Sequence, residues 1–269
     1  MMRFLSLGAG VQSTTLALMA AKGEIGPMPD AAIFADTGWE PAHVYKHLDW
    51  LEGELPFPVV RVTRPGLDLG AHAIEIATAP VTRTASPPWF TKNPRGMLPR
   101  QCSKEFKVRV IQQEVRRRLG LSKGQRGPKE VVVEQWIGIS SDEIQRMKDS
   151  ELAYVRNIFP LVDLKMSRAD CLQWMEERFY PRPPKSSCIF CPYRGDDQWR
   201  EMRDNNPDDW AKAVEFDAAI RPGFHGMEGQ AFVHRRRVPL DQVDLAPKAD
   251  PAAPREFGFL EECEGICGV

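Results

Sequence analysis

A chain of 269 residues is long enough for one large hydrophobic core or for a core with an appended region. Hydrophobic residues make up 42% and charged residues 27%, which is ordinary for a globular protein and excludes disordered and membrane-embedded classes. The net charge of −1 gives no whole-molecule attraction to nucleic acid or to a membrane surface. Since no apolar run reaches the roughly 18 residues that span a bilayer, and since the opening residues are too short for a signal peptide, we expect a cytoplasmic protein without a membrane partner.

Strand-like and helix-like segments alternate in the first third of the chain. Short apolar runs predict buried strands at residues 3–7, 31–35 and 58–62, and the segments between them predict helices at residues 13–22 and 41–51. This β-α-β-α-β order predicts a parallel sheet with right-handed crossovers and helices on both faces. The predicted fold class is therefore α/β, with a doubly wound, mostly parallel sheet.

The pattern continues less regularly after the third strand. Residues 66–100 are rich in proline and predict a long irregular loop of the kind that covers a site. A helix is expected over residues 106–119 and a buried strand over residues 131–139. A capping box at residues 167–170 opens another helix, and two short helices are expected between residues 196 and 219.

A glycine turn joins the first predicted strand to the first predicted helix. Gly8 and Gly10 let the backbone turn sharply and approach a ligand without a Cβ in the way. The helix that follows offers its N-terminal N–H groups and the positive end of its dipole to an anion, and Ser13 and Thr14 add hydroxyl donors. Because ligands of open parallel sheets bind beyond the carboxyl ends of the strands, residues 36–38 are placed to meet the same ligand.

Several motifs resemble one family. Residues 6–13, Ser-Leu-Gly-Ala-Gly-Val-Gln-Ser, resemble the PP-loop of the adenine-nucleotide alpha-hydrolase superfamily. Asp-Thr-Gly-Trp at residues 36–39, followed by Tyr45, is similar to the Asp-Thr-Gly motif of the phosphoadenosine-phosphosulfate (PAPS) reductase family. Residues 138–146 and 159–163 look like that family's strand-end motif and its proline-containing segment. The resemblance covers roughly residues 3–200 and implies an adenine-nucleotide-alpha-hydrolase-like fold with a small adenine nucleotide as its ligand.

The resemblance also implies which residues contact the nucleotide. The candidates are Ser6, Gly8, Ala9, Gly10, Gln12, Ser13, Thr14, Asp36, Thr37, Gly38, Gly138 and Arg146. Gln12 stands where ATP-cleaving members have an Asp that helps to hold magnesium, and a neutral amide is a poorer ligand for a hard cation. Reductase-type members carry Gly-hydrophobic-Gln here, so Gln12 favours a sulfonucleotide over ATP. We accordingly expect a nucleotide-binding α/β domain at residues 1–165 and a helical and irregular region, with a cysteine-bearing C-terminal extension, at residues 166–269.

Four cysteines are candidate metal ligands. Cys188 and Cys191 form a Cys-x-x-Cys motif, which can bind zinc or an iron–sulfur cluster or act as a redox dithiol. In adenylylsulfate-type reductases a Cys-Cys pair joins such a motif to bind a 4Fe–4S cluster, whereas this chain has Cys102 followed by Ser103. Cys171 completes a four-ligand set if it faces the site. If it packs on an apolar helix face instead, three ligands leave one iron open, as in some tRNA-thiolating relatives, and zinc is the alternative metal.

The last residues carry two more cysteines, Cys263 and Cys267. The segment resembles the Glu-Cys-Gly tail on which sulfonucleotide reductases carry their nucleophilic cysteine. The resemblance implies that Cys267 attacks the sulfur of a bound sulfonucleotide, with a thioredoxin-like reductant as partner. Cys263 then either resolves the intermediate or relays a persulfide. A tail without a catalytic role is the alternative, since chain ends are often poorly ordered.

These residues are compatible with three functions. The leading hypothesis is an enzyme of the sulfonucleotide-reductase type. The second is an ATP-dependent sulfur transferase that thiolates a nucleobase in tRNA or DNA, the one hypothesis in which nucleic acid is a partner. Gln12 favours the first, whereas the incomplete Cys102-Ser103 pattern and the basic residues 116–118 favour the second. The third is a nucleotide- or cluster-binding module without catalysis.

Overall fold

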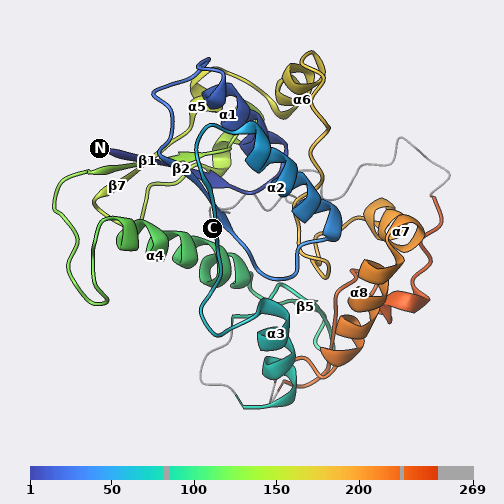
Figure 1. The fold of residues 1–269 in the computed structure, drawn as a ribbon. Helices are drawn as coiled ribbons and strands as arrows, with labels where there is room; N and C mark the ends of the chain where they lie inside the picture. Colours follow the sequence, from blue (N-terminus) through green and yellow to red (C-terminus); the bar gives the residue numbers. More distant parts are fainter. Residues whose placement is uncertain (81–84, 225–226, 248–269) are drawn as a thin grey trace.

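The computed structural model describes residues 1–80, 85–224 and 227–247. Five strands form a central parallel sheet in the order β3-β2-β1-β6-β7 (Figure 1). The strands are β1 (Met2–Leu7), β2 (Ala31–Ala35), β3 (Val59–Val62), β6 (Val133–Ile137) and β7 (Val155–Ile158). The predicted doubly wound α/β class is confirmed.

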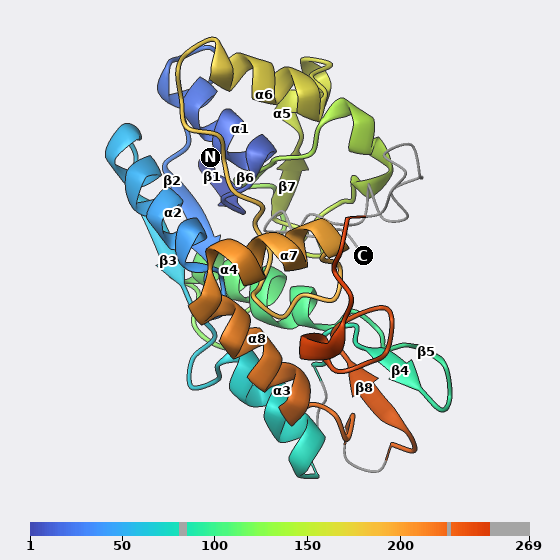
Figure 2. The same cartoon turned by 90° about the vertical axis from the view of Figure 1, so that its right-hand side faces the viewer.

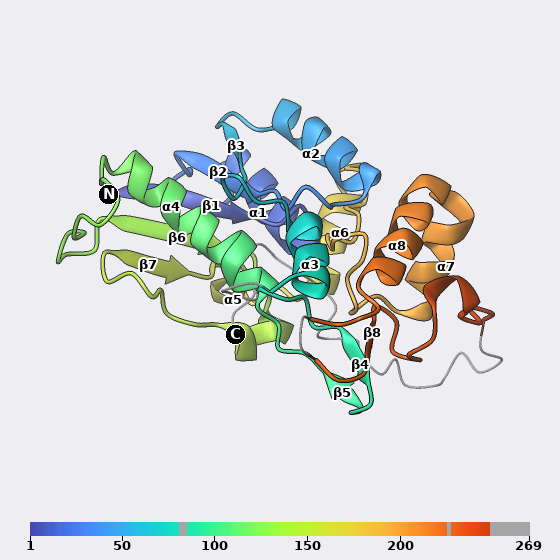
Figure 3. The same ribbon diagram turned by 90° about the horizontal axis from the view of Figure 1, so that it is seen from below.

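Helices cover both faces of the sheet. Alternate side chains of each strand point to opposite faces, and apolar side chains on both faces pack against these helices. Leu5 and Leu7 of β1 join one core with side chains of three helices, α1 (Val11–Ala21), α2 (Ala42–Glu54) and α6 (Arg168–Glu176). Phe4 joins the other core, where Ile111 and Val115 of α4 (Arg109–Arg118) pack. Figure 3 shows α4 along one side of the sheet and α1 and α2 on the other.

A second group of elements has its own core (Figure 2). It contains a small antiparallel sheet in the order β5-β4-β8 and three helices. These are β4 (Phe90–Lys92), β5 (Gly96–Met97), β8 (Gln230–Phe232), α3 (Leu69–Thr78), α7 (Asp196–Asn205) and α8 (Pro207–Ala219). Its core includes an aromatic cluster of Trp39, Phe190 and Phe216. The rings of Phe190 and Phe216 are stacked with their centroids 3.7 Å apart.

The two cores do not divide the chain between residues 165 and 166. Helix α6 lies beyond this point, yet Cys171, Trp174 and Met175 pack in the sheet's core. Conversely, α3 and the β4–β5 hairpin lie before it and pack with α7 and α8. The second core is thus built from two separate stretches of sequence.

The segment expected to be an irregular loop, residues 66–100, contains α3 and the β4–β5 hairpin. Asp68 is the N-cap of α3: its carboxylate accepts a hydrogen bond from the Ala71 N–H at 2.8 Å and so caps the first turn. Proline residues flank these elements without interrupting them, so the proline content alone was misleading.

Most of the remaining helices lie where the sequence predicts them. The helix expected over residues 106–119 begins as a π-helix, η1 (Lys104–Val108), and continues as α4, while α7, α8 and the capping box of α6 lie where expected. The strands β7 and β8 were not expected, nor were the short elements η2 (Ser141–Arg146), α5 (Pro160–Asp163) and η3 (Leu240–Gln242). Over the described ranges, no helix has the length and hydropathy that a bilayer crossing demands.

Gly70 gives a test of how α3 packs against Trp39, the residue that follows Gly38 at the end of β2. A Cβ at this position would lie 2.0 Å from Trp39 Cε2, so the indole would have to move. We expect Gly70→Ala to lower the free energy of unfolding by about 1–3 kcal/mol, the usual cost of overpacking. Gly53 in α2 has open space where its Cβ would be, so Gly53→Ala is the matched control and should raise stability by about 0.5 kcal/mol. Urea denaturation measures both values, and an unchanged Gly70→Ala protein would contradict the tight contact.

Candidate nucleotide and thiol site

The sheet reverses its winding at β1. The chain runs from β1 through β2 to β3 on one side and then returns to place β6 and β7 on the other. In open α/β sheets ligands bind at such a switch point, outside the carboxyl ends of the strands. The turn after β1 and the segment after β6 flank this point. Gly138 lies so close to α1 that a Cβ would be 2.8 Å from the Ser13 nitrogen, so the two segments touch through their backbones.

The turn after β1 has the backbone form of an anion site. Ala9 has a φ of 58°, and Gly10 is the extended N-cap of α1. Successive N–H groups beside a left-handed residue form a concavity that suits an anion, and the N-terminus of the following helix adds to it. The turn is buried, and the Gly8 N–H donates to Ser13 Oγ at 3.2 Å. An anion entering here would replace this internal hydrogen bond.

Gln12 and Arg146 belong to one buried network. The Gln12 amide donates to Ser140 Oγ at 3.3 Å and to Glu143 Oε2 at 3.2 Å, and its side chain is fully buried. Arg146 forms an ion pair with Glu143 Oε1 at 2.6 Å. The network ties the first turn of α1 to η2 across the switch point. Arg146, expected to face an anion, thus has its charge matched by Glu143.

The Asp-Thr-Gly motif forms the turn at the end of β2. Asp36 Oδ1 accepts hydrogen bonds from the Gly38 N–H and from the Tyr45 hydroxyl, both at 2.8 Å. Gly38 has a φ of 76°, a conformation that favours glycine. Burial, and then the hydrogen bond to Asp36, raise the pKa of Tyr45 far above its ordinary value, so its hydroxyl stays a neutral donor.

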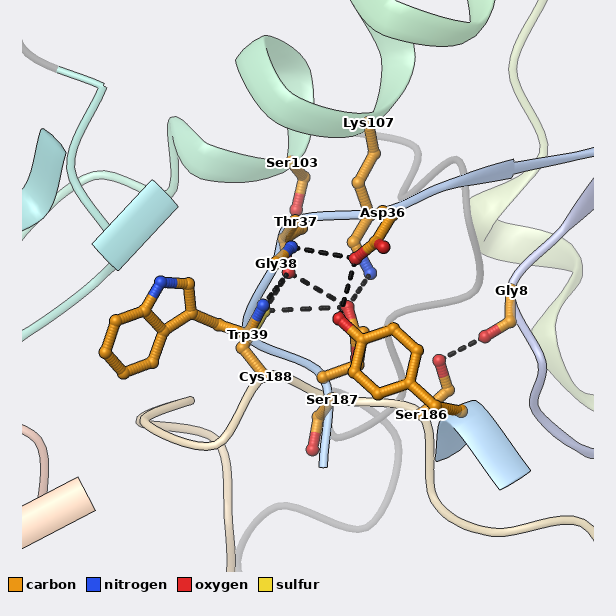
Figure 4. A network of polar contacts seen from close by, with 12 residues as sticks. Gly8, Asp36, Thr37, Gly38, Trp39, Ser103, Lys107, Ser186, Ser187 and Cys188 are labelled. Carbon is orange, nitrogen blue, oxygen red and sulfur yellow. Dashed lines mark hydrogen bonds and ion pairs between the residues drawn. The ribbon is translucent and has the colours of Figure 1, made fainter. Parts of the chain in front are cut away.

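The Cys-x-x-Cys loop docks on this turn (Figure 4). Thr37 Oγ1 lies 3.4 Å from Cys188 Sγ, and the Ile189 N–H donates to the Trp39 carbonyl at 2.8 Å. Cys191 and Cys102 line the same pocket as Cys188, although they come from distant segments. Its cavity of ≈ 30 Å³ has room for one or two water molecules.

Three of the four expected metal ligands, Cys102, Cys188 and Cys191, line one pocket, and Cys171 does not. Cys171 is fully buried in the core between α6 and the sheet, where its carbonyl accepts a hydrogen bond from Thr15 Oγ1 at 3.4 Å. This placement corrects the four-ligand set. Among the residues that the structure describes, no three His, Cys, Asp or Glu side chains are close enough to share a metal ion. Cys263 and Cys267 lie outside the described residues.

A buried ion pair sits beside the thiols. Glu40 Oε1 accepts hydrogen bonds from Lys107 Nζ at 3.3 Å and from Thr37 Oγ1 at 3.2 Å. Cys188 Sγ points at the same oxygen from 3.8 Å. Burial, and then the charge of Glu40, raise the pKa of Cys188 well above its ordinary value, which favours the thiol over the thiolate. Arg194 fixes the loop by donating to the carbonyls of Ser187 and Cys188.

Glu40 and Ser186 were not among the expected site residues. Glu40 follows the Asp-Thr-Gly-Trp motif directly, and Ser186 stands two residues before Cys188. Ser186 Oγ donates a hydrogen bond to the Gly8 carbonyl, and its side chain is buried. Their positions next to motifs were the one available signal.

The basic residues 116–118 contribute to folding. Arg117 and Arg118 pair with Glu114, and Arg116 donates to the Tyr154 hydroxyl and to two carbonyls of the loop that follows α4. These contacts weaken the argument for a nucleic-acid surface on this helix.

No protein-family model and no curated protein matches the chain. Among solved structures it is similar to phosphoadenylyl-sulfate (PAPS) reductase from Candida auris in a phosphate complex. The two share 14% sequence identity, the match covers 67% of this chain and 74% of that chain, and the TM-score is 0.45. At this identity the likeness says nothing about the substrate of this chain.

The ion pair between Glu40 and Lys107 can be measured directly. Both side chains are almost fully buried, so Lys107→Met leaves a carboxylate without its cation and should destabilise the protein by about 3–5 kcal/mol. Glu40→Gln combined with Lys107→Met should recover at least about 1 kcal/mol of this loss. Chemical denaturation of the two single variants and the double variant gives the coupling. Additive effects would show that the pair does not stabilise the fold.

His47 makes stability depend on pH. Its Nε2 lies 3.1 Å from Thr14 Oγ1, and burial lowers its pKa to about 4. The unfolded chain takes up a proton near pH 6.5 and the folded chain only near pH 4, so stability falls as pH drops through this window, by about 3 kcal/mol. His47→Leu should show a shallower decline in denaturation experiments between pH 6.5 and pH 4. An identical decline would mean that the pKa of His47 is not lowered in the folded chain.

Proposed function

We propose that the protein binds an adenosine phosphosulfate at the switch point of its sheet and directs a thiol at the sulfur. One observation carries the proposal: the Cys-x-x-Cys loop is anchored to the end of β2 through Thr37 and Cys188, next to the anion-type turn after β1. A nucleotide whose charged end enters that turn would bring its sulfur group to the edge of the sheet where the thiols lie.

The network around Gln12 supports a sulfonucleotide over ATP. The Gln12 amide is used on Ser140 and Glu143, and Glu143 is paired with Arg146, so this corner of the site carries no surplus negative charge. A corner of this kind is a poor ligand for magnesium, which prefers carboxylate oxygens. Thiol attack on a sulfonucleotide does not involve pyrophosphate release, so this corner suits it.

The chemistry needs two thiols and a leaving group. A thiolate attacks the sulfur, the S–O bond to the nucleotide phosphate breaks, and the adenosine phosphate leaves with the electron pair. The resulting S-sulfonate is then attacked by a second thiolate, which releases sulfite and leaves a disulfide. A dithiol reductant of the thioredoxin type returns the disulfide to thiols. Because the raised pKa of Cys188 disfavours its thiolate, we assign the first attack to Cys267 and the second to Cys263, both outside the described residues.

A metal centre fits the described pocket only in part. Cys102, Cys188 and Cys191 would be its ligands, and the thiolates could hold one zinc ion or an iron–sulfur cluster with one open iron. The cavity is too small for either group, and the three thiols are too far apart to share one. The side chains would first have to move closer together. No step of the proposed reaction therefore passes through a metal, and visible absorption near 400 nm with metal analysis of anaerobically purified protein tests the centre separately.

The three-thiol arrangement favours a second candidate. An ATP-dependent sulfur transferase that thiolates a nucleobase would use a centre held by three cysteines, with no fourth cysteine ligand. Cys102, Cys188 and Cys191, which line one pocket, are such a set of three. Such an enzyme would activate its substrate by releasing pyrophosphate from ATP.

Turnover assays decide between the candidates. With a dithiol reductant present, we expect sulfite release from adenosine phosphosulfate or its 3′-phosphate, and a loss of at least about 1000-fold in Cys267→Ser because the nucleophile is gone. Cys171→Ala is the matched control, since this thiol lies in the other core, and should keep its turnover. Pyrophosphate release from ATP without sulfite release would support the sulfur transferase, and no turnover on any of the three would leave a binding module.

A further inference from the structure

Residues 181–188, which we call the strap, run from the end of α6 towards the Cys-x-x-Cys loop along the carboxyl edge of the sheet. Ser186 donates a hydrogen bond to the Gly8 carbonyl in the turn after β1. Two residues further on, Cys188 contacts Thr37 in the turn after β2. Ser186 and Cys188, two residues apart on one backbone, thus contact the turn after β1 and the turn after β2, as Figure 4 shows.

The contact of Ser186 controls the direction of an N–H group. In a planar trans peptide the C=O and N–H point to opposite sides. Because Ser186 holds the Gly8 carbonyl, the Ala9 N–H of the same peptide must point away from the strap. Ala9 is the left-handed residue of the turn, so its N–H is one of the groups that an anion would use. An anion that reorients this peptide also moves the Gly8 carbonyl, and so changes the hydrogen bond that Ser186 donates to it.

The strap transmits such a movement because it is short and closely packed. Ser186 and Cys188 are separated by about 7 Å of extended chain at most. Ser186 and Ser187 are 3% and 1% exposed, and close-packed interiors leave little space to absorb a shift. Three prolines in the preceding residues 181–184 further restrict the backbone.

We infer that Ser186 is a positioning residue that couples occupancy of the turn after β1 to the exposure of Cys188. The inference rests on the proposed nucleotide site and adds to it a mechanical link between nucleotide and thiol. A bound sulfonucleotide tightens the turn against Ser186, which holds the strap and keeps Cys188 in its pocket. By linkage, any event that pulls Cys188 out of the pocket weakens nucleotide binding by the same factor.

The test measures how fast iodoacetamide alkylates Cys188, followed by peptide mass spectrometry, with and without saturating adenosine 3′-phosphate 5′-phosphosulfate. Equilibrium binding of the same nucleotide is measured in parallel. For the wild-type protein we expect the nucleotide to slow alkylation at least about fivefold. In Ser186→Ala the nucleotide still binds, but the two rates become equal within twofold.

Two variants separate coupling from a general structural effect. Ser187→Ala removes a neighbouring buried hydroxyl for which the described residues offer no hydrogen-bond partner, and it should keep the fivefold effect. Ser186→Thr retains a hydroxyl at the position and should restore at least part of it. Thermal melting of each variant shows whether it is folded, and the wild-type comparison is decisive even if Ser186→Ala does not fold.

The outcomes distinguish the two proposals. If the wild-type protein does not bind the nucleotide, the proposed function fails and the coupling fails with it. If the nucleotide binds and the alkylation rate of Cys188 does not change, the coupling alone is wrong. Persistence of the fivefold effect in Ser186→Ala also overturns the role of Ser186.

Discussion

The end of β2 is the point on which the rest of the site depends. A single turn, residues 36–39, holds the Cys-x-x-Cys loop through one backbone hydrogen bond and one hydroxyl–thiol contact. The turn is itself held by Asp36, which binds the Gly38 N–H and the Tyr45 hydroxyl. Because β2 is a central strand, paired on both sides, this anchor is rigid. The thiols are therefore placed relative to the turn after β1 by the register of the sheet.

Charge within the site is balanced in pairs. Glu40 is matched by Lys107, and Glu143 by Arg146, each pair being largely removed from water. Removing a charged group from water is costly unless it has a partner, so each pair must be retained as a unit. The consequence for a ligand is that its own charge must be met by backbone N–H groups. The turn after β1 and the first turn of α1 supply such groups.

The sequence predicted the sheet more successfully than the site. Buried parallel strands are continuous apolar runs, so residues 31–35 could be delimited from the sequence alone. Helix α3 was missed because prolines surround it and its cap, Asp68, is a local signal too weak to outweigh them. The assignment of Cys171 could not be made from the sequence, since packing on an apolar helix face and ligation of a metal use the same residue type. Glu40 and Ser186 act through partners far away in the sequence, Lys107 and Gly8, and no pattern within a short window reveals such partners.

The stacking of Phe190 on Phe216 has a consequence for how the molecule assembles. The Cys-x-x-Cys loop is held from one side by β2, 151 residues earlier, and from the other by α8, which follows it. Contacts between distant segments form slowly, because a long stretch of chain must first be brought together. The sheet can close around β1, β2 and β3 while the later residues are still being synthesised. The contact of Phe190 with Phe216, in contrast, forms only after α8 has been synthesised, so the loop that carries Cys188 and Cys191 reaches its final packing late in the life of the newborn chain.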